Sequence, residues 1–111
     1  MSVDLSRKLV LETAVRAADG AGGFAEDWVP LGVVWAQVKA GSGRERFGAG
    51  VTKSTVPYRI VVRAAPVGAP SRPSPDQRFR DGTRVFRILA VAEYDRDQAY
   101  LTCFTTEEVA G

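Results

Sequence analysis

Polar and apolar residues alternate along several short stretches of this chain, and such alternation is typical of a β-strand with one buried face. In Arg7–Arg16, for example, Leu9 and Leu11 fall on one side while Lys8 and Glu12 fall on the other. The first side continues through Thr13 and Val15. The same kind of pattern predicts four further strands, over Trp28–Lys39, Val56–Ala65, Thr83–Glu93 and Gln98–Thr106.

The second predicted strand contains residues that limit how it can pair. Pro30 and Gly32 should confine regular pairing to the later half of the stretch, because proline has no amide donor and glycine weakens a strand. Trp28 and Trp35 stand beside strand valines, and we expect them to anchor the core.

The strand over Thr83–Glu93 is apolar on both faces, so it should lie in the centre of a sheet. One face is expected to hold Arg84, Phe86, Ile88, Ala90 and Ala92, and the other Val85, Arg87, Leu89 and Val91. With the last strand it should form a hairpin around residues 94–97.

Three segments between these strands are predicted to be loops. Glycines stand at residues 20, 22 and 23 and recur through Ala40–Ser54, so the chain should turn at the first segment and form a long exposed loop at the second. Pro66–Pro75 holds four prolines and should run as a stiff, extended, polyproline-like excursion. We therefore expect an all-β fold, a small antiparallel barrel of about five to six strands with long Gly-rich and Pro-rich loops.

Length and hydropathy point to one domain without a membrane anchor. The 111 residues suit a single domain over 1–111. No apolar run approaches the roughly 18 residues that a membrane span needs, and Asp4 and Lys8 interrupt any leader-like segment at the start. We expect a protein that is made in the cytoplasm and does not enter a membrane.

The composition offers little for catalysis. Histidine is absent, which removes the commonest general base and a frequent metal ligand. The single cysteine, Cys103, lies in an apolar stretch and is expected to be a small buried residue. The paired acids Glu26/Asp27, Asp95/Asp97 and Glu107/Glu108 are interpreted as solvated turn or terminal residues. We predict no catalytic residue, no cofactor and no metal.

Charge is distributed unevenly. Residues 1–30 carry three basic and five acidic groups (−2), residues 31–87 eleven and three (+8), and residues 88–111 one and five (−4). The central segment could face a polyanion while the acidic ends face basic protein surfaces, or its charges could simply coat solvated strand faces. Because no recognition helix is expected, any DNA contact should be non-specific.

The order of five motifs resembles the phage head-tail joining family, the head-completion or stopper proteins of tailed phages and phage-like particles. The motifs are Arg7–Glu12, Gly23–Trp28, Val34–Val38 with Gly43–Phe47, Tyr58–Arg63, and Gly82–Ile88 continued through Tyr94-Asp95 to Tyr100–Cys103. The resemblance covers nearly the whole chain and departs at Ala64–Gln77, where the family usually turns more directly.

The resemblance implies a non-enzymatic subunit of a homo-oligomeric ring at the head-tail interface of a phage or gene transfer agent. Such a stopper would close the DNA exit channel, bind an adaptor or portal-side connector protein, and dock a tail terminator or tail tube protein. By analogy the Ala40–Ser54 loop faces the channel, with Arg44, Arg46 and Lys53 near packaged double-stranded DNA. We expect Arg72, Glu107 and Glu108 to make assembly contacts.

Two other functions stay open at the level of sequence. One is a small-barrel nucleic-acid-binding module, in which arginines hold a backbone and Trp35, Phe47 or Tyr58 stack on bases. The other is an accessory domain that binds a peptide partner.

Overall fold

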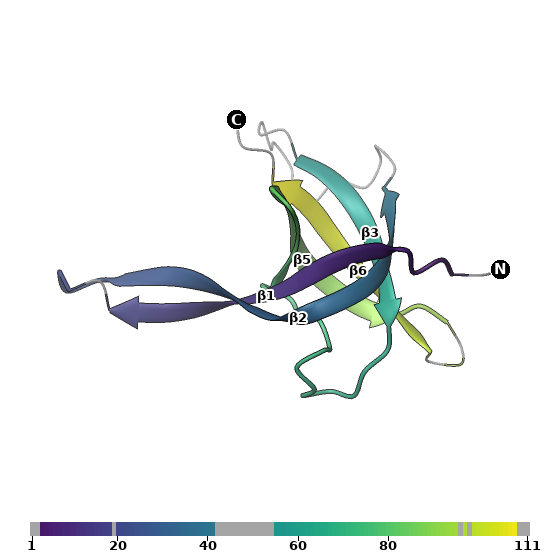
Figure 1. Cartoon of the computed structure of the whole chain (residues 1–111), viewed down its shortest axis with the longest axis horizontal. Helices are drawn as coiled ribbons and strands as arrows, with labels where there is room; N and C mark the ends of the chain where they lie inside the picture. Colours follow the sequence, from purple (N-terminus) through teal and green to yellow (C-terminus); the bar gives the residue numbers. More distant parts are fainter. Residues whose placement is uncertain (1–2, 19, 42–54, 96, 98, 109–111) are drawn as a thin grey trace.

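The computed structural model describes residues 3–18, 20–41, 55–95, 97 and 99–108. Within them lie six strands: β1 (Arg7–Ala18), β2 (Phe24–Ala40), β3 (Thr55–Arg63), β4 (Arg78–Asp81), β5 (Arg84–Glu93) and β6 (Tyr100–Glu108). All pairs are antiparallel and the sheet closes into a barrel in the order β1-β2-β3-β6-β5-β4 (Figure 1). The predicted all-β antiparallel barrel is confirmed.

The short strand β4 is the element that alternation did not reveal. It spans four residues, pairs with β5 through the Asp81-Gly82 turn, and closes the barrel by pairing with Val10–Glu12 of β1. Four residues hold too few alternating positions to form a recognisable pattern.

The barrel interior is filled by one apolar cluster. Its members are Leu9, Leu11, Ala36, Ile60, Val62, Phe79, Phe86, Ile88, Leu101 and Cys103. Cys103 is fully buried, as expected. The tryptophan prediction is wrong, because Trp35 is 53% exposed and Trp28 is only partly covered on the outside of the sheet.

Two bulges change which residues face the core. In β5 the register shifts between Ile88 and Ala90. The predicted continuation of the buried face through Ala90 and Ala92 is therefore wrong: both are exposed, and Val91 packs against the core instead. Leu89, at the bulge, is 40% exposed. A one-residue insertion reverses the facing of every later side chain.

The second bulge lies in β2, opposite the junction of Leu11 and Glu12. Leu11 pairs with Gly32 and Glu12 with Pro30, so Leu31 is the extra residue. Pairing then continues to Ala18 and Phe24, contrary to the expectation that it would be confined to the later half. Pro30 is tolerated because β2 has no second neighbour there, since β3 pairs only with Ala36–Ala40.

The pairing of β1 with β2 runs past the barrel wall and forms a two-stranded arm. We define the arm as Thr13–Ala18 and Phe24–Val29, which have no strand neighbour other than each other. Figure 1 shows the arm extending far from the barrel, along the longest dimension of 52 Å. Gly20 and Gly22, at φ of 81° and 85°, make the turn at its end.

The segment between β3 and β4 hangs below the barrel in Figure 1. It is not the extended polyproline-like excursion that was expected, because backbone hydrogen bonds from Ala69 to Pro66 and from Arg72 to Ala69 fold it into turns. Pro73 is fully buried. The described part of the chain contains no helix with the length and apolarity to cross a membrane.

Candidate assembly interface

A buried carboxylate lies on the outer surface of the barrel at the base of the arm. The β1–β4 register places Glu12 beside Arg78 and close to Arg80. Their Nε atoms donate to the two carboxylate oxygens of Glu12, over 2.7 Å from Arg78 and 2.8 Å from Arg80. The Glu12 side chain is only 5% exposed. Burial raises its pKa, but the hydrogen bonds from Arg80 and Arg78 outweigh burial and hold the pKa below 4.5.

Arginines of β4 and β5 also contact the arm. Arg78 pairs across the sheet with Arg87 of β5. The two guanidinium carbons lie 4.2 Å and 5.6 Å from the ring centroid of Trp28, which belongs to the arm. Cation–π contacts of this kind contribute about 0.5–1 kcal/mol each at exposed sites. We call Glu12, Trp28, Arg78, Arg80 and Arg87 the brace, because they tie the arm to β4 and β5.

The predicted assembly residues Glu107 and Glu108 lie within β6, not beyond the last strand as expected. Glu107 accepts hydrogen bonds from Arg84 at 2.7 Å and 3.1 Å, and these bonds lower the pKa of its carboxyl. Glu108 lies 3.9 Å from Arg87. The interpretation of the pair as solvated terminal residues is therefore wrong for Glu107, whose side chain is 15% exposed.

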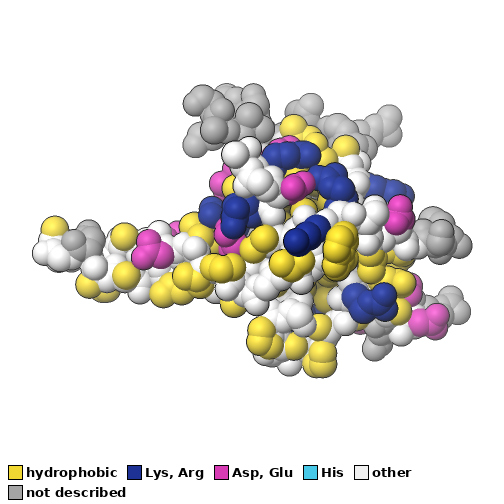
Figure 2. Space-filling model, in the orientation of Figure 1, with side chains coloured by type: hydrophobic (Ala, Val, Ile, Leu, Met, Phe, Trp, Pro, Cys, Tyr) yellow, Lys and Arg dark blue, Asp and Glu magenta, His cyan; other side chains and the backbone are white. Residues whose placement is uncertain are grey.

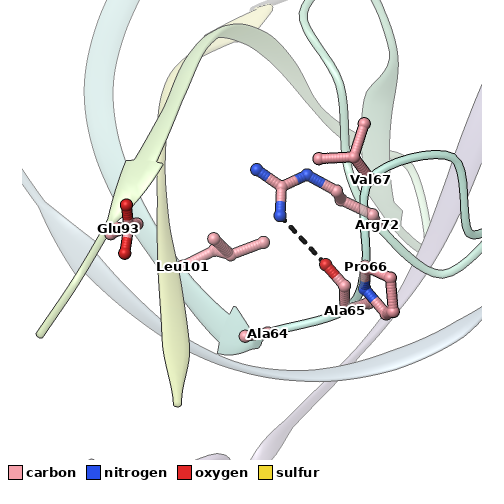
Figure 3. A pocket seen from close by; sticks show the side chains of 7 residues that line it. All are labelled: Ala64, Ala65, Pro66, Val67, Arg72, Glu93 and Leu101. Carbon is pink, nitrogen blue, oxygen red and sulfur yellow. Dashed lines mark hydrogen bonds between the residues drawn. The ribbon is translucent and has the colours of Figure 1, made fainter. Parts of the chain in front are cut away.

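Arg72 lies at the opposite rim of the barrel. Its Nη1 donates to the carbonyl of Ala65 over 2.9 Å. Figure 3 shows the guanidinium reaching from the loop toward Leu101 across a cavity of about 500 Å³, which Glu93 borders on the other side. The expected anchor at the loop tip thus has a partner within its own loop, and its assembly contact stays a prediction.

Arg44, Arg46 and Lys53, with Phe47, lie outside the described residues. The residues that flank their segment are described: Gly41 donates to the carbonyl of Pro57 over 2.8 Å, and Thr55 pairs with Glu108. Both flanking residues, Gly41 and Thr55, therefore lie at the rim that carries Glu107 and Glu108. The structure brings these ends together and puts Arg72 at the other rim.

Exposed apolar side chains form a feature that sequence reasoning missed. Phe24 is 66% exposed, Trp35 53%, Val33 51% and Val15 45%. Figure 2 shows hydrophobic side chains along the arm and over the visible face of the barrel. For Val33 and Trp35 the signal was present in the sequence, since both faces of Trp28–Lys39 are partly apolar.

A groove of about 460 Å³ lies beside two of these residues. Val33, Trp35 and Leu5 supply apolar walls and Arg63 supplies a charge. We call it the Trp35 groove. Neither it nor any other part of the described chain brings together three or more residues of the types that could hold a metal ion. The surfaces of this protein are suited to contacts with other macromolecules.

Comparison with known proteins agrees with that view. The family model for the phage head completion protein matches residues 1–108. A chain from the structure described as "Virion of native gene transfer agent (GTA) particle" is 64% identical, with a TM-score of 0.81, 97% of this chain and 98% of that chain being covered. No curated protein matches.

A second solved structure has the same fold at low identity. Protein SF1141 from Shigella flexneri 2a is 23% identical with a TM-score of 0.67, and 96% of each chain is covered. The resemblance read from the five motifs is confirmed by the family match, and so are the structural, non-enzymatic role and the place in a phage-like particle. The chain belongs to the phage head completion protein family.

Proposed function

We propose that this chain is a subunit of the connector ring at the head-tail interface of a gene transfer agent or a similar particle, where it closes the DNA exit channel and docks the tail. One observation carries the proposal: a chain of a native gene transfer agent virion is 64% identical over 97% of this sequence. At that identity over almost the full length, two chains are expected to occupy equivalent positions in their particles.

The two rims of the barrel give the subunit two different ends, which supports a connecting role. One rim carries the flanks of residues 42–54 and the acidic end of β6. The other carries the loop from Ala64 to Gln77 with Arg72. A subunit with distinct ends can bind an adaptor or portal-side connector on one side and a tail terminator or tail tube protein on the other. Closure of the sheet keeps both ends in a fixed relation.

The proposed channel contact is non-specific attraction between cations and phosphate. Arg44, Arg46 and Lys53 are repeated in every subunit of a ring, so weak single contacts become a collective barrier to DNA escape. Changing all three to serine should leave the barrel folded and yield particles that lose DNA before tail attachment. Retention of DNA at the wild-type level would remove the channel role of this segment.

Arg72, Glu107 and Glu108 are proposed as contacts to neighbours at the two rims. Glu108 is the cleaner test of the acidic pair, because its side chain is 50% exposed and its ion pair with Arg87 is long. Glu108→Gln should lower particle yield without altering the folded barrel, whereas Glu107→Gln should also lower stability because Arg84 loses its partner. Normal particle yield from both variants would exclude an assembly role for these acids.

The function as a whole is tested by depletion and add-back. Particles made without this chain should accumulate as heads that lack tails, and adding the purified protein should restore tail attachment. Tailed, DNA-filled particles without it would refute the proposal.

The ion pairs of three arginines in β4 and β5 weigh against a nucleic-acid-binding module. Such a module needs arginines that are free to hold a backbone, but Arg78 and Arg80 are paired with Glu12, and Arg84 with Glu107.

A further inference from the structure

The arm ends in apolar side chains that the chain itself leaves uncovered. Phe24, the first residue of β2, is 66% exposed, and the guanidinium carbon of Arg16 lies 4.8 Å from its ring centroid. Val15, 45% exposed, lies opposite Asp27. A two-stranded ribbon is marginally stable in water by itself, so apolar residues at its far end indicate a surface that becomes covered elsewhere.

The Trp35 groove is an apolar surface of the opposite kind, a hollow rather than a projection. Trp35 and Val33 line it and are both more than half exposed. Arg63, also exposed, stands at its side.

The arm cannot reach the groove of its own chain. Phe24 pairs with Ala18 and Trp35 pairs with Lys8, ten residues earlier in β1. At roughly 3.3 Å per strand residue, these positions are about 33 Å apart along a rigid ribbon. Figure 1 shows the arm at one end of the molecule and the N-terminal segment, which supplies Leu5 to the groove, at the other end. Only another molecule can join them.

The charges of the two surfaces are complementary. Glu26 and Asp27 of the arm are exposed acids, and across the ladder Glu26 lies opposite Arg16 and Asp27 opposite Val15. Lys8, beside Trp35 on the neighbouring strand, and Arg63 in the groove are exposed cations. A second copy therefore offers both an apolar fit and opposite charge to the arm, which guides register and partner choice.

We propose that the arm of each subunit inserts into the Trp35 groove of the next copy of the same chain. The inference rests on the proposed ring and names the contact that builds it. A projection at one end and a hollow at the other form a heterologous, head-to-tail interface, which generates a closed ring when the rotation per subunit closes. The brace sets the direction of the arm and hence that rotation.

Cross-linking within assembled particles tests the contact. A chain with both Phe24→Cys and Val33→Cys, treated with a short thiol-to-thiol cross-linker, should yield a ladder of covalent multimers. Each single variant should stay monomeric on a denaturing gel, because Cys103 is buried and each interface then holds only one accessible cysteine. Phe24→Cys combined with Thr83→Cys, at an exposed turn on the opposite rim, is the matched control and should give no ladder.

A second pair of cysteine substitutions shows whether the result depends on the particular residues replaced. Val15→Cys with Arg63→Cys should give the same ladder, and Glu26→Arg with Asp27→Arg should reduce it by several-fold. Dimers from Phe24→Cys alone would overturn the proposal in favour of a tip-to-tip contact. Particles that contain the double-cysteine chains but give no ladder would overturn it while leaving the connector role intact. Absence of the chain from particles would instead refute the proposed function.

Discussion

Glu12 shows how a single residue can be critical on a surface that is nominally outside the core. Its carboxylate is almost fully covered and receives one hydrogen bond from each of two arginines. Removing one member of such a group leaves the others with unmatched charge, which costs more than the group itself contributes. The pairing of β1 with β4 closes the barrel, and it therefore depends on the charge of Glu12.

Glu12→Gln should lower the free energy of unfolding by about 2 kcal/mol at pH 7. Because the pKa of Glu12 is lowered in the folded protein, its stabilisation is full above the unfolded value of 4.5 and is lost as pH falls through the folded pKa. The difference between wild type and variant, measured by denaturant unfolding, should therefore shrink toward pH 3. A difference that is constant with pH would show that Glu12 acts through shape alone.

Cys103 should be chemically silent in the folded protein. Burial raises the pKa of its thiol from 9.0 to about 12, so at pH 8 only about one thiol in ten thousand is ionised. A thiol-reactive chromophore should label the native chain at least a hundredfold more slowly than the unfolded chain. Rapid labelling of native protein would mean that the barrel opens readily at β6.

Among the elements, the arm depends most on contacts outside its own backbone ladder. The brace holds the arm through Trp28, whose ring contacts the guanidinium groups of Arg78 and Arg87. Loss of the indole should release the arm and leave the barrel closed.

Trp28→Ala should accelerate amide hydrogen exchange across Thr13–Ala18 and Phe24–Val29 by about fivefold or more, which corresponds to about 1 kcal/mol of lost cation–π contact. Exchange in β3 and β6 should not change. Trp35→Ala is the matched control, because Trp35 is 53% exposed and lies outside the brace. Equal acceleration in both variants would contradict the assignment.

The sequence predicted the strands better than it predicted which side chains point into the barrel. Five of the six strands and the closed antiparallel barrel follow from alternation, and Cys103 follows from its apolar neighbours. The bulges at Leu31 and Leu89 were not predictable, because an extra residue depends on the partner strand. Alternation predicts that Val15 faces the core. It is exposed because it lies in the arm, which extends beyond the barrel.

For the candidate sites too, the sequence predicted the general role but not the individual contacts. Charge and family resemblance indicated an assembly protein, but the partners of individual charges are set by register. Glu107 looked like a free terminal acid until β6 was seen to place it against Arg84. Trp28 looked like a core anchor, and only the pairing of Arg78 with Arg87 reveals the surface contact that holds it.

At the scale of the whole molecule, a rigid barrel carries distinct contacts at its two rims, an arm at one end of its long axis and a groove at the other. The rims suit stacking between different rings, and the arm and groove suit contacts within one ring. The arm tip and the groove lie outside the core that stabilises the barrel, so variants at Phe24 or Val33 should fold normally.

An electron cryomicroscopy reconstruction of the intact particle tests the connector role most directly. The account predicts a symmetric ring of density at the head-tail interface into which this barrel fits, with each arm lying against the neighbouring copy. A reconstruction whose junction contains no such barrel, or in which the barrel lies elsewhere in the particle, would contradict it.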